Sequence, residues 1–215
     1  WDAETGGQVD SIDLPNYVAI NDMSISADGT RLLLLGCVRF DARAQCIESD
    51  VILYDPNTGE IVQRFDPTAK NAHQRAEGVT EGQPTAFAGA IAPDNSTILT
   101  GGGGGIAVLW DVKTGEVIRQ YTDEKNGHDS RIIDVAYHPS LAHVLTSGID
   151  FMIIAWERET GRLLAAMDDH DGRVDSLSFD ASGATFASGS DDTTVIVWDA
   201  ASYEPIIRLR GHNGE

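Results

Sequence analysis

The chain has 215 residues, of which 41% are hydrophobic and 23% are charged, so it can build an apolar core. It carries 34 Asp and Glu against 15 Lys and Arg, a formal net charge of -19, whereas nucleic acids and anionic membranes require clustered Lys and Arg. No apolar run approaches the ~20 residues that span a bilayer. The charge and the lack of such a run together exclude nucleic acids and membranes as expected partners. A basic protein partner or a high-salt host would explain the acidity, but the spread of the acidic residues through the turns favours general solubility.

The sequence repeats itself along most of its length. Trp156 lies 28 residues after His128, and Trp198 lies 28 residues after His170, in a second stretch that begins 42 residues further on. A turn of the Asp-x-x-Thr-Gly kind follows most of the closing aromatic residues. A fixed period of this length indicates a repeat architecture.

Setting the copies in register gives their order along the chain. The prediction is a remnant of one copy at 1–13, full copies at about 16–66, 82–121, 127–167 and 169–210, and the opening of another at 211–215. Successive closing aromatics are 53, 56, 46 and 42 residues apart, which places large insertions at about 38–49 and 66–82. Because the two end remnants do not complement one another and no initiator Met is present, we expect a piece of a longer chain.

Each copy is predicted to form short strands separated by Asp, Gly, Asn and Pro turns. Runs such as Val51–Tyr54, Ile153–Trp156 and Val195–Trp198 are continuously apolar, which is typical of strands covered on both faces. No window long enough for a helix has apolar residues at a spacing of 3.6. The sequence therefore predicts an all-β protein of small four-stranded sheets stacked around an axis.

At this point the chain resembles the WD40-repeat family, which has an opening Gly-His, an Asp-Gly turn and a closing Trp-Asp. The matching segments are Gly127-His128, Gly211-His212, Ala27-Asp28-Gly29, Trp110-Asp111 and Trp198-Asp199. The resemblance implies a WD40-type β-propeller, with four complete four-stranded blades and partial blades at both ends. Because such propellers typically close with seven blades, it also implies that the chain is part of a propeller of seven or more blades.

The resemblance further implies buried polar tetrads of His, Ser or Thr, Asp and Trp. The two complete sets are His128, Thr146, Asp150 and Trp156, and His170, Ser188, Asp192 and Trp198. The first two copies depart from this pattern. Asn16, Leu34 and Tyr54 stand at the His, Ser and Trp positions of the first copy, and Gly82 and Gly104 replace His and Asp in the second. We therefore expect residues 120–210 to be the more rigid half.

A nucleophilic triad has the same ingredients as one of these sets, namely His170, Ser188 and Asp192. The set recurs 42 residues earlier in the chain, which a single active site does not require but repeated blades do. The His residues also show no metal-ligand spacing. We expect no catalytic residue, no cofactor and no metal site.

Binding is expected on the face where the loops after the second strand and the links between blades open together. The candidates within the two insertions are Arg39, Phe40, Arg43, Lys70, His73 and Arg75. An insertion that is tolerated and binds nothing explains them equally well. On the regular blades, the positions that family members commonly use to hold peptides correspond to Ser130, Arg131, Ile149, Gly172, Arg173 and Asp191.

The expected function is that of a non-catalytic scaffold for protein–protein interactions, or a subunit of a multi-protein complex. Two alternatives stay open. One is a regulatory module that senses a basic peptide, and the other is an enzyme or ligand-binding propeller whose site lies in missing parts of the chain.

The chain has two cysteines, Cys37 and Cys46, which flank the first insertion and could pair across it. In a chain of this size, two cysteines are more often free thiols of an intracellular protein. We therefore expect free thiols and an intracellular, cytoplasmic location.

Overall fold

The computed structural model describes residues 4–8, 11, 17–44, 46–69, 72 and 85–212. Within them the chain forms sixteen β-strands and no helix, arranged as four antiparallel four-stranded sheets. The described part of the chain accordingly has no helix that could cross a membrane. The all-β prediction is confirmed, while the end remnants at 1–13 and 211–215 lie largely outside the described residues.

Each sheet consists of four strands that are consecutive in the chain. The first sheet contains β1 (Ala19–Ile25), β2 (Leu32–Phe40), β3 (Cys46–Asp55) and β4 (Glu60–Phe65). The second contains β5 (Ala86–Ile91), β6 (Thr97–Gly102), β7 (Ala107–Asp111) and β8 (Val117–Tyr121). The third contains β9 (Ile132–Tyr137), β10 (His143–Gly148), β11 (Ile153–Glu157) and β12 (Leu163–Met167). The fourth contains β13 (Val174–Phe179), β14 (Thr185–Ser190), β15 (Thr194–Asp199) and β16 (Pro205–Arg210).

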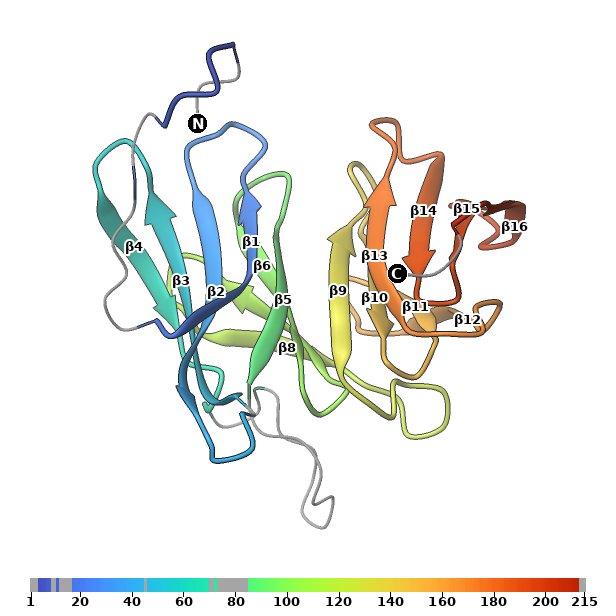
Figure 1. Ribbon diagram of the computed structural model, residues 1–215, viewed down its shortest axis with the longest axis horizontal. Helices are drawn as coiled ribbons and strands as arrows, with labels where there is room; N and C mark the ends of the chain where they lie inside the picture. Colours follow the sequence, from blue (N-terminus) through green and yellow to red (C-terminus); the bar gives the residue numbers. More distant parts are fainter. Residues whose placement is uncertain are drawn as a thin grey trace.

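The sheets stack in chain order around their first strands. β1 contacts β5, β5 contacts β9, and β9 contacts β13. Each second strand also packs against the first strand of the next sheet, as β2 does on β5. Figure 1 shows β5 and β9 in the middle of the molecule, with β3 and β4 towards one side and β15 and β16 towards the other. This is the arrangement of neighbouring β-propeller blades.

An apolar core fills each of the three interfaces between sheets. Leu33 and Leu35 of the first sheet pack with Val108 and Trp110 of the second, and similar clusters join the second sheet to the third and the third to the fourth. The fit is close, since a Cβ on Gly101 would lie 2.4 Å from a methyl group of Ile132. The inner sheets are thus covered on both faces, which explains their continuously apolar strands.

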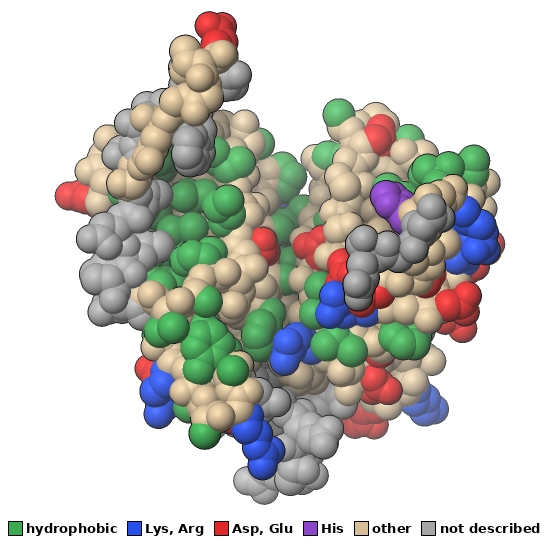
Figure 2. Space-filling view, in the orientation of Figure 1, with side chains coloured by type: hydrophobic (Ala, Val, Ile, Leu, Met, Phe, Trp, Pro, Cys, Tyr) green, Lys and Arg blue, Asp and Glu red, His purple; other side chains and the backbone are tan. Residues whose placement is uncertain are grey.

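The outer face of the first sheet is different, because apolar side chains of its first strand are exposed. Figure 2 shows apolar side chains gathered over β1 and β2. Met23 and Ile25 are 67% and 64% exposed. β1 is therefore packed on one side only within the described part of the chain.

The four copies are equivalent in the register of their sheets. Within each sheet one residue of the second strand pairs with an apolar residue of the third strand, two positions before the closing aromatic. The pairs are Leu34 with Ile52, Thr100 with Val108, Thr146 with Ile154, and Ser188 with Ile196. Side chains that stand for one another in the sequence repeat therefore occupy the same place in each sheet.

The first insertion lengthens a hairpin. β2 and β3 run on past the ordinary strand length, with Arg39 opposite Glu48 and Phe40 opposite Cys46, and a short turn joins them. The expectation of free thiols is wrong, because Cys37 and Cys46 form a disulfide bond. Two register shifts in the hairpin bring their Cα atoms to 5.8 Å, within the range that a disulfide spans. The expected intracellular location was based on free thiols, so the disulfide bond removes that support.

Candidate functional site

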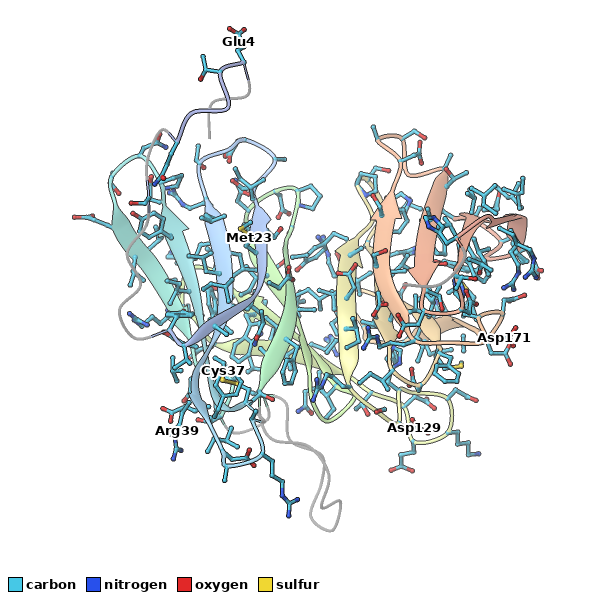
Figure 3. The ribbon with its side chains drawn as sticks, viewed as in Figure 1. Glu4, Met23, Cys37, Arg39, Asp129 and Asp171 are labelled. Atoms are coloured by element: carbon cyan, nitrogen blue, oxygen red, sulfur yellow. A yellow bond between two sulfur atoms is a disulfide. The ribbon has the colours of Figure 1, made fainter. Side chains whose placement is uncertain are left out.

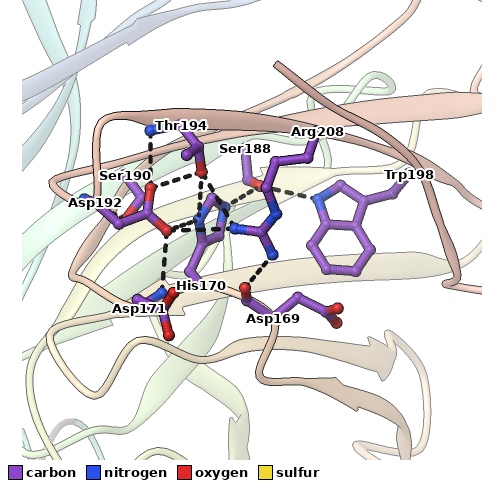
Figure 4. A network of polar contacts seen from close by, with 9 residues as sticks. All are labelled: Asp169, His170, Asp171, Ser188, Ser190, Asp192, Thr194, Trp198 and Arg208. Carbon is purple, nitrogen blue, oxygen red and sulfur yellow. Dashed lines mark hydrogen bonds and ion pairs between the residues drawn. The ribbon is translucent and has the colours of Figure 1, made fainter. Parts of the chain in front are cut away.

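The fourth sheet holds a continuous polar network in its interior (Figure 4). The indole Nε1 of Trp198 donates to Ser188 Oγ at 2.9 Å, and Ser188 Oγ lies 2.7 Å from His170 Nε2. The other ring nitrogen, His170 Nδ1, lies 2.8 Å from Asp192 Oδ2. Every donor has an acceptor when His170 carries its proton on Nδ1 and the Ser188 hydroxyl donates to Nε2.

Asp192 is held by further donors around the same network. The backbone amides of Asp171 and Thr194 donate to its carboxylate at 3.0 and 2.8 Å, and the Thr194 hydroxyl donates at 2.6 Å. Burial alone would raise the pKa of Asp192, but the hydrogen bonds from Thr194, His170 and the amides outweigh burial and hold that pKa well below its ordinary value. Arg208 of β16 adds an ion pair at 3.6 Å. The carboxylate is therefore ionised and fixes the loop that enters β13.

The third sheet repeats this network in full. His128 Nε2 lies 2.8 Å from Thr146 Oγ1, its Nδ1 lies 2.8 Å from Asp150 Oδ2, and Trp156 donates to Thr146 at 3.0 Å. In the second sheet the indole of Trp110 donates to Thr100 Oγ1 at 2.7 Å.

In the first sheet the Ser and Trp positions carry Leu34, which is buried, and Tyr54, which is half-buried. Asn16 and Gly82, which stand at the two remaining His positions, lie outside the described residues. No described part of the first sheet therefore repeats the Trp-to-hydroxyl contact of the other three.

The His170 set has the bonding of a nucleophilic triad, but its surroundings oppose catalysis. Ser188 is 1% exposed, and its oxygen already accepts the indole proton of Trp198. A substrate carbonyl therefore cannot reach it. The described residues also contain no group of three or more His, Cys, Asp or Glu placed to hold a metal ion.

Two carboxylates near the axis bind neighbouring sheets together, and sequence reasoning missed both. Asp22 of β1 accepts the amides of Met23 and of Gly89 in β5, at 2.7 and 2.8 Å. In the same way, Asp134 of β9 accepts the amide of Val135 at 2.7 Å and, from the next sheet, the amide of Leu177 at 2.7 Å.

The environment of these two carboxylates shifts both pKa values upward. Burial raises the pKa of Asp134 to about 6. The amides of Leu177 and Val135 lower this pKa, and the charge of Asp22 raises it slightly. Burial also raises the pKa of Asp22. The available signal was their shared position, six residues after His128 and after the matching Asn16, where the other copies have Ala88 and Ser176.

The loops expected to bind partners lie at one end of the sheets. We call this end the loop face, and it consists of 39–44, 128–131, 149–152, 169–173 and 191–193. Figure 3 shows Arg39 and Asp129 at this end. One backbone bond recurs there, because the amide of Ile149 donates to the carbonyl of Arg131 and the amide of Asp191 donates to that of Arg173, both at 3.0 Å. The structure thus brings these predicted residues together in pairs.

The predicted candidates of the loop face differ in how their side chains are engaged. Arg39 pairs with Glu48 at 2.9 Å, and Arg173 pairs with Asp175 at 2.5 Å and Asp191 at 3.4 Å. The remaining side chains make no ion pair within the described residues, and Phe40 is 39% exposed. The remaining described candidates are Phe40, Arg43, Ser130, Arg131, Ile149 and Gly172, while Lys70, His73 and Arg75 lie outside the described residues.

Four stacked four-stranded sheets, two of them with the same buried network, define a propeller-type repeat protein. Residues 117–157 and 161–199 match the family model for WD40, described as WD domain, G-beta repeat. Residues 117–199 thus consist of WD40 repeats, and the first two sheets share their four-stranded fold.

The curated relatives to which the chain is similar are longer. GID complex subunit 7 of Schizosaccharomyces pombe is 27% identical over 84% of this chain and 32% of its own length. The guanine nucleotide-binding protein subunit beta of Oryza sativa subsp. indica is 32% identical over 50% of this chain and 29% of its own length. Transducin beta-like protein 3 of Rattus norvegicus is 35% identical over 51% of this chain and 14% of its own length. The chain thus spans less than a third of each relative, and two of the three are subunits by name.

Proposed function

We propose that the protein is a non-catalytic scaffold that binds protein partners through its loop face and works as a subunit of a larger assembly. The observation that carries the proposal is the separation of buried polar networks from the candidate binding residues on the loop face. The polar groups that resemble catalytic machinery are buried inside the blades, whereas Phe40, Arg43 and Arg131 lie in the loop face and form no ion pair within the described residues. The names of two relatives, a GID complex subunit and a G-protein subunit, support membership of an assembly.

The net charge of -19 favours a partner whose contact segment is basic overall. A regulatory module that senses a basic peptide is the second candidate, and it differs from a scaffold mainly in affinity. Its binding would weaken steeply between low and physiological salt, because exposed charges are screened over about 8 Å at 0.15 M.

A cytoplasmic location remains part of the proposal, and the disulfide bond makes it testable. Disulfides persist in oxidising compartments and are rare in the cytosol. Thiol alkylation and mass spectrometry of the native protein would show whether Cys37 and Cys46 are reduced. A fully oxidised pair would remove the cytoplasmic assignment.

The loop face is tested by capture of native partners with matched surface variants. Phe40→Glu/Ile149→Glu places two charges on the loop face, and Leu141→Glu/Ile61→Glu places two charges at the opposite end, where the native side chains are 51% and 42% exposed. We expect the loop-face variant to capture about tenfold less of the partner proteins, or still less, and the control to capture the same amount as the native protein. Equal capture by both variants would contradict the assignment of binding to this face.

A further inference from the structure

Arg131 lies at the start of β9 and reaches across the interface to the second sheet. Its guanidinium carbon is 4.2 Å from the centroid of the Phe87 ring in β5. Stacking on an aromatic face fixes the plane of a guanidinium and leaves the N–H groups at its edge available. Arg131 is therefore an oriented cation and not a flexible surface charge.

This cation has no carboxylate of its own in the described part of the chain. No Asp or Glu among the described residues lies within ion-pair distance of Arg131, although the protein carries 34 acidic residues. The equivalent Arg173 is neutralised by Asp175 and Asp191. Burial, and then the nearby charge of Arg173, lower the pKa of Arg131, so the two cations are close enough to interact.

A half-buried guanidinium with free edge donors binds a planar carboxylate through two parallel N–H···O bonds. A doubly charged phosphate fits less well here, because Asp175 and Asp191 lie beside Arg173, and Coulomb repulsion doubles with the charge of the ligand. The acidity of the whole protein acts in the same direction and favours neutral or basic residues around that one carboxylate.

We propose that Arg131, held over Phe87, is the docking point for a single Asp or Glu side chain of a partner peptide whose flanking residues are neutral or basic. This inference rests on the proposed function of the loop face and names the chemistry that it recognises. The carboxylate forms a bidentate pair with Arg131, while the flanking residues contact the remainder of the loop face.

The test uses libraries of short synthetic peptides with randomised neutral or basic flanks. The central residue is fixed as Glu, Gln or phosphoserine, and the chain is immobilised at physiological salt. We expect the Glu library to be retained about tenfold more than the Gln library. Arg131→Gln should reduce this preference to less than about twofold, and Phe87→Leu should weaken it about threefold by freeing the guanidinium.

Arg162→Gln is the matched control, since it removes the same charge from the turn between β11 and β12, where Arg162 pairs with Glu157 at 3.3 Å. It should keep the full preference, and circular dichroism should show that all variants are folded. Equal retention of the Glu and Gln libraries, no retention of either, stronger retention of phosphoserine, or an unchanged preference in Arg131→Gln would each overturn the proposal. If native capture still depends on Phe40 and Ile149 in that case, the loop face binds partners by other chemistry, and the proposed function stands without this inference.

Discussion

The first and fourth sheets have the same four-stranded shape but are held together by different chemistry. In the fourth sheet Trp198, Ser188 and His170 form a buried polar chain that ends on an ionised carboxylate. In the first sheet Leu34 is buried at the position of Ser188, and a disulfide bond ties the end of the hairpin. The described residues of the first sheet thus combine apolar packing with a covalent link where the fourth uses a hydrogen-bonded network.

The difference shows that the apolar strands, and not the polar network, determine the shape of a blade. The network has a more specific effect, because a buried donor without an acceptor is costly and a packing that breaks the bonds of Trp198, Ser188 or His170 leaves such a donor. Leu34 and Ile52 impose no such condition, so the first sheet depends more on its covalent link. We therefore expect 120–210 to exchange backbone hydrogen more slowly than 16–66.

Removal of the closing aromatic should have the largest effect on this comparison. Trp198 is fully buried and stacks on Phe186 with ring centroids 5.8 Å apart, whereas the equivalent Tyr54 is half-buried. We expect Trp198→Ala to lower the free energy of unfolding by about 3–5 kcal/mol and Tyr54→Ala by about 1 kcal/mol. Urea unfolding followed by circular dichroism measures both values. Equal losses would mean that the two blades depend on their aromatic residues to the same extent.

Loss of the disulfide bond should act in the opposite region. The bond joins residues nine apart in the sequence, and closing a loop of this length stabilises by about 2–3 kcal/mol. In Cys37→Ala/Cys46→Ala, hydrogen exchange followed by mass spectrometry should be faster across β2 and β3 and unchanged across β14 and β15. Faster exchange in both sheets would show that the chain opens as one cooperative body.

Much of the fold could be predicted because it is written repeatedly in the sequence. Apolar runs such as Val195–Trp198, followed by Asp-x-x-Thr-Gly turns, predict the same strand and turn in several copies. A copy with a weaker pattern can therefore be assigned from the others. The tetrads were implied by the resemblance to WD40 repeats, and the register of the copies gave the positions of their residues. The candidates in the first insertion, such as Arg39 and Phe40, are by contrast single residues without a repeat to support them.

Three features escaped prediction because they depend on contacts that the repeated sequence pattern does not specify. The hairpin register that pairs Cys37 with Cys46 contains two shifts that no sequence pattern announces. Asp134 resembles any surface Asp until its carboxylate is seen to accept an amide from the next sheet. The same holds for Arg131, whose partner Phe87 belongs to another copy.

The smallest expected effect concerns pH and the carboxylate between the third and fourth sheets. The pKa of Asp134 rises from 3.8 to about 6 on folding, so the native state binds this proton more tightly than the unfolded state does. Its contribution to stability is therefore greatest at low pH and is lost as the pH rises through about 6.

Asp134→Asn removes this titration, although it also leaves an amide without its acceptor at every pH. Relative to that variant, the native protein should be about 1 kcal/mol more stable at pH 5 than at pH 7.5. Because Asp192 is present in both proteins, its opposite dependence, in which stability is lost as the pH falls below about 4, cancels in the difference. Parallel urea midpoints for the two proteins across this range would show that Asp134 does not titrate there, and that its carboxylate is ionised throughout.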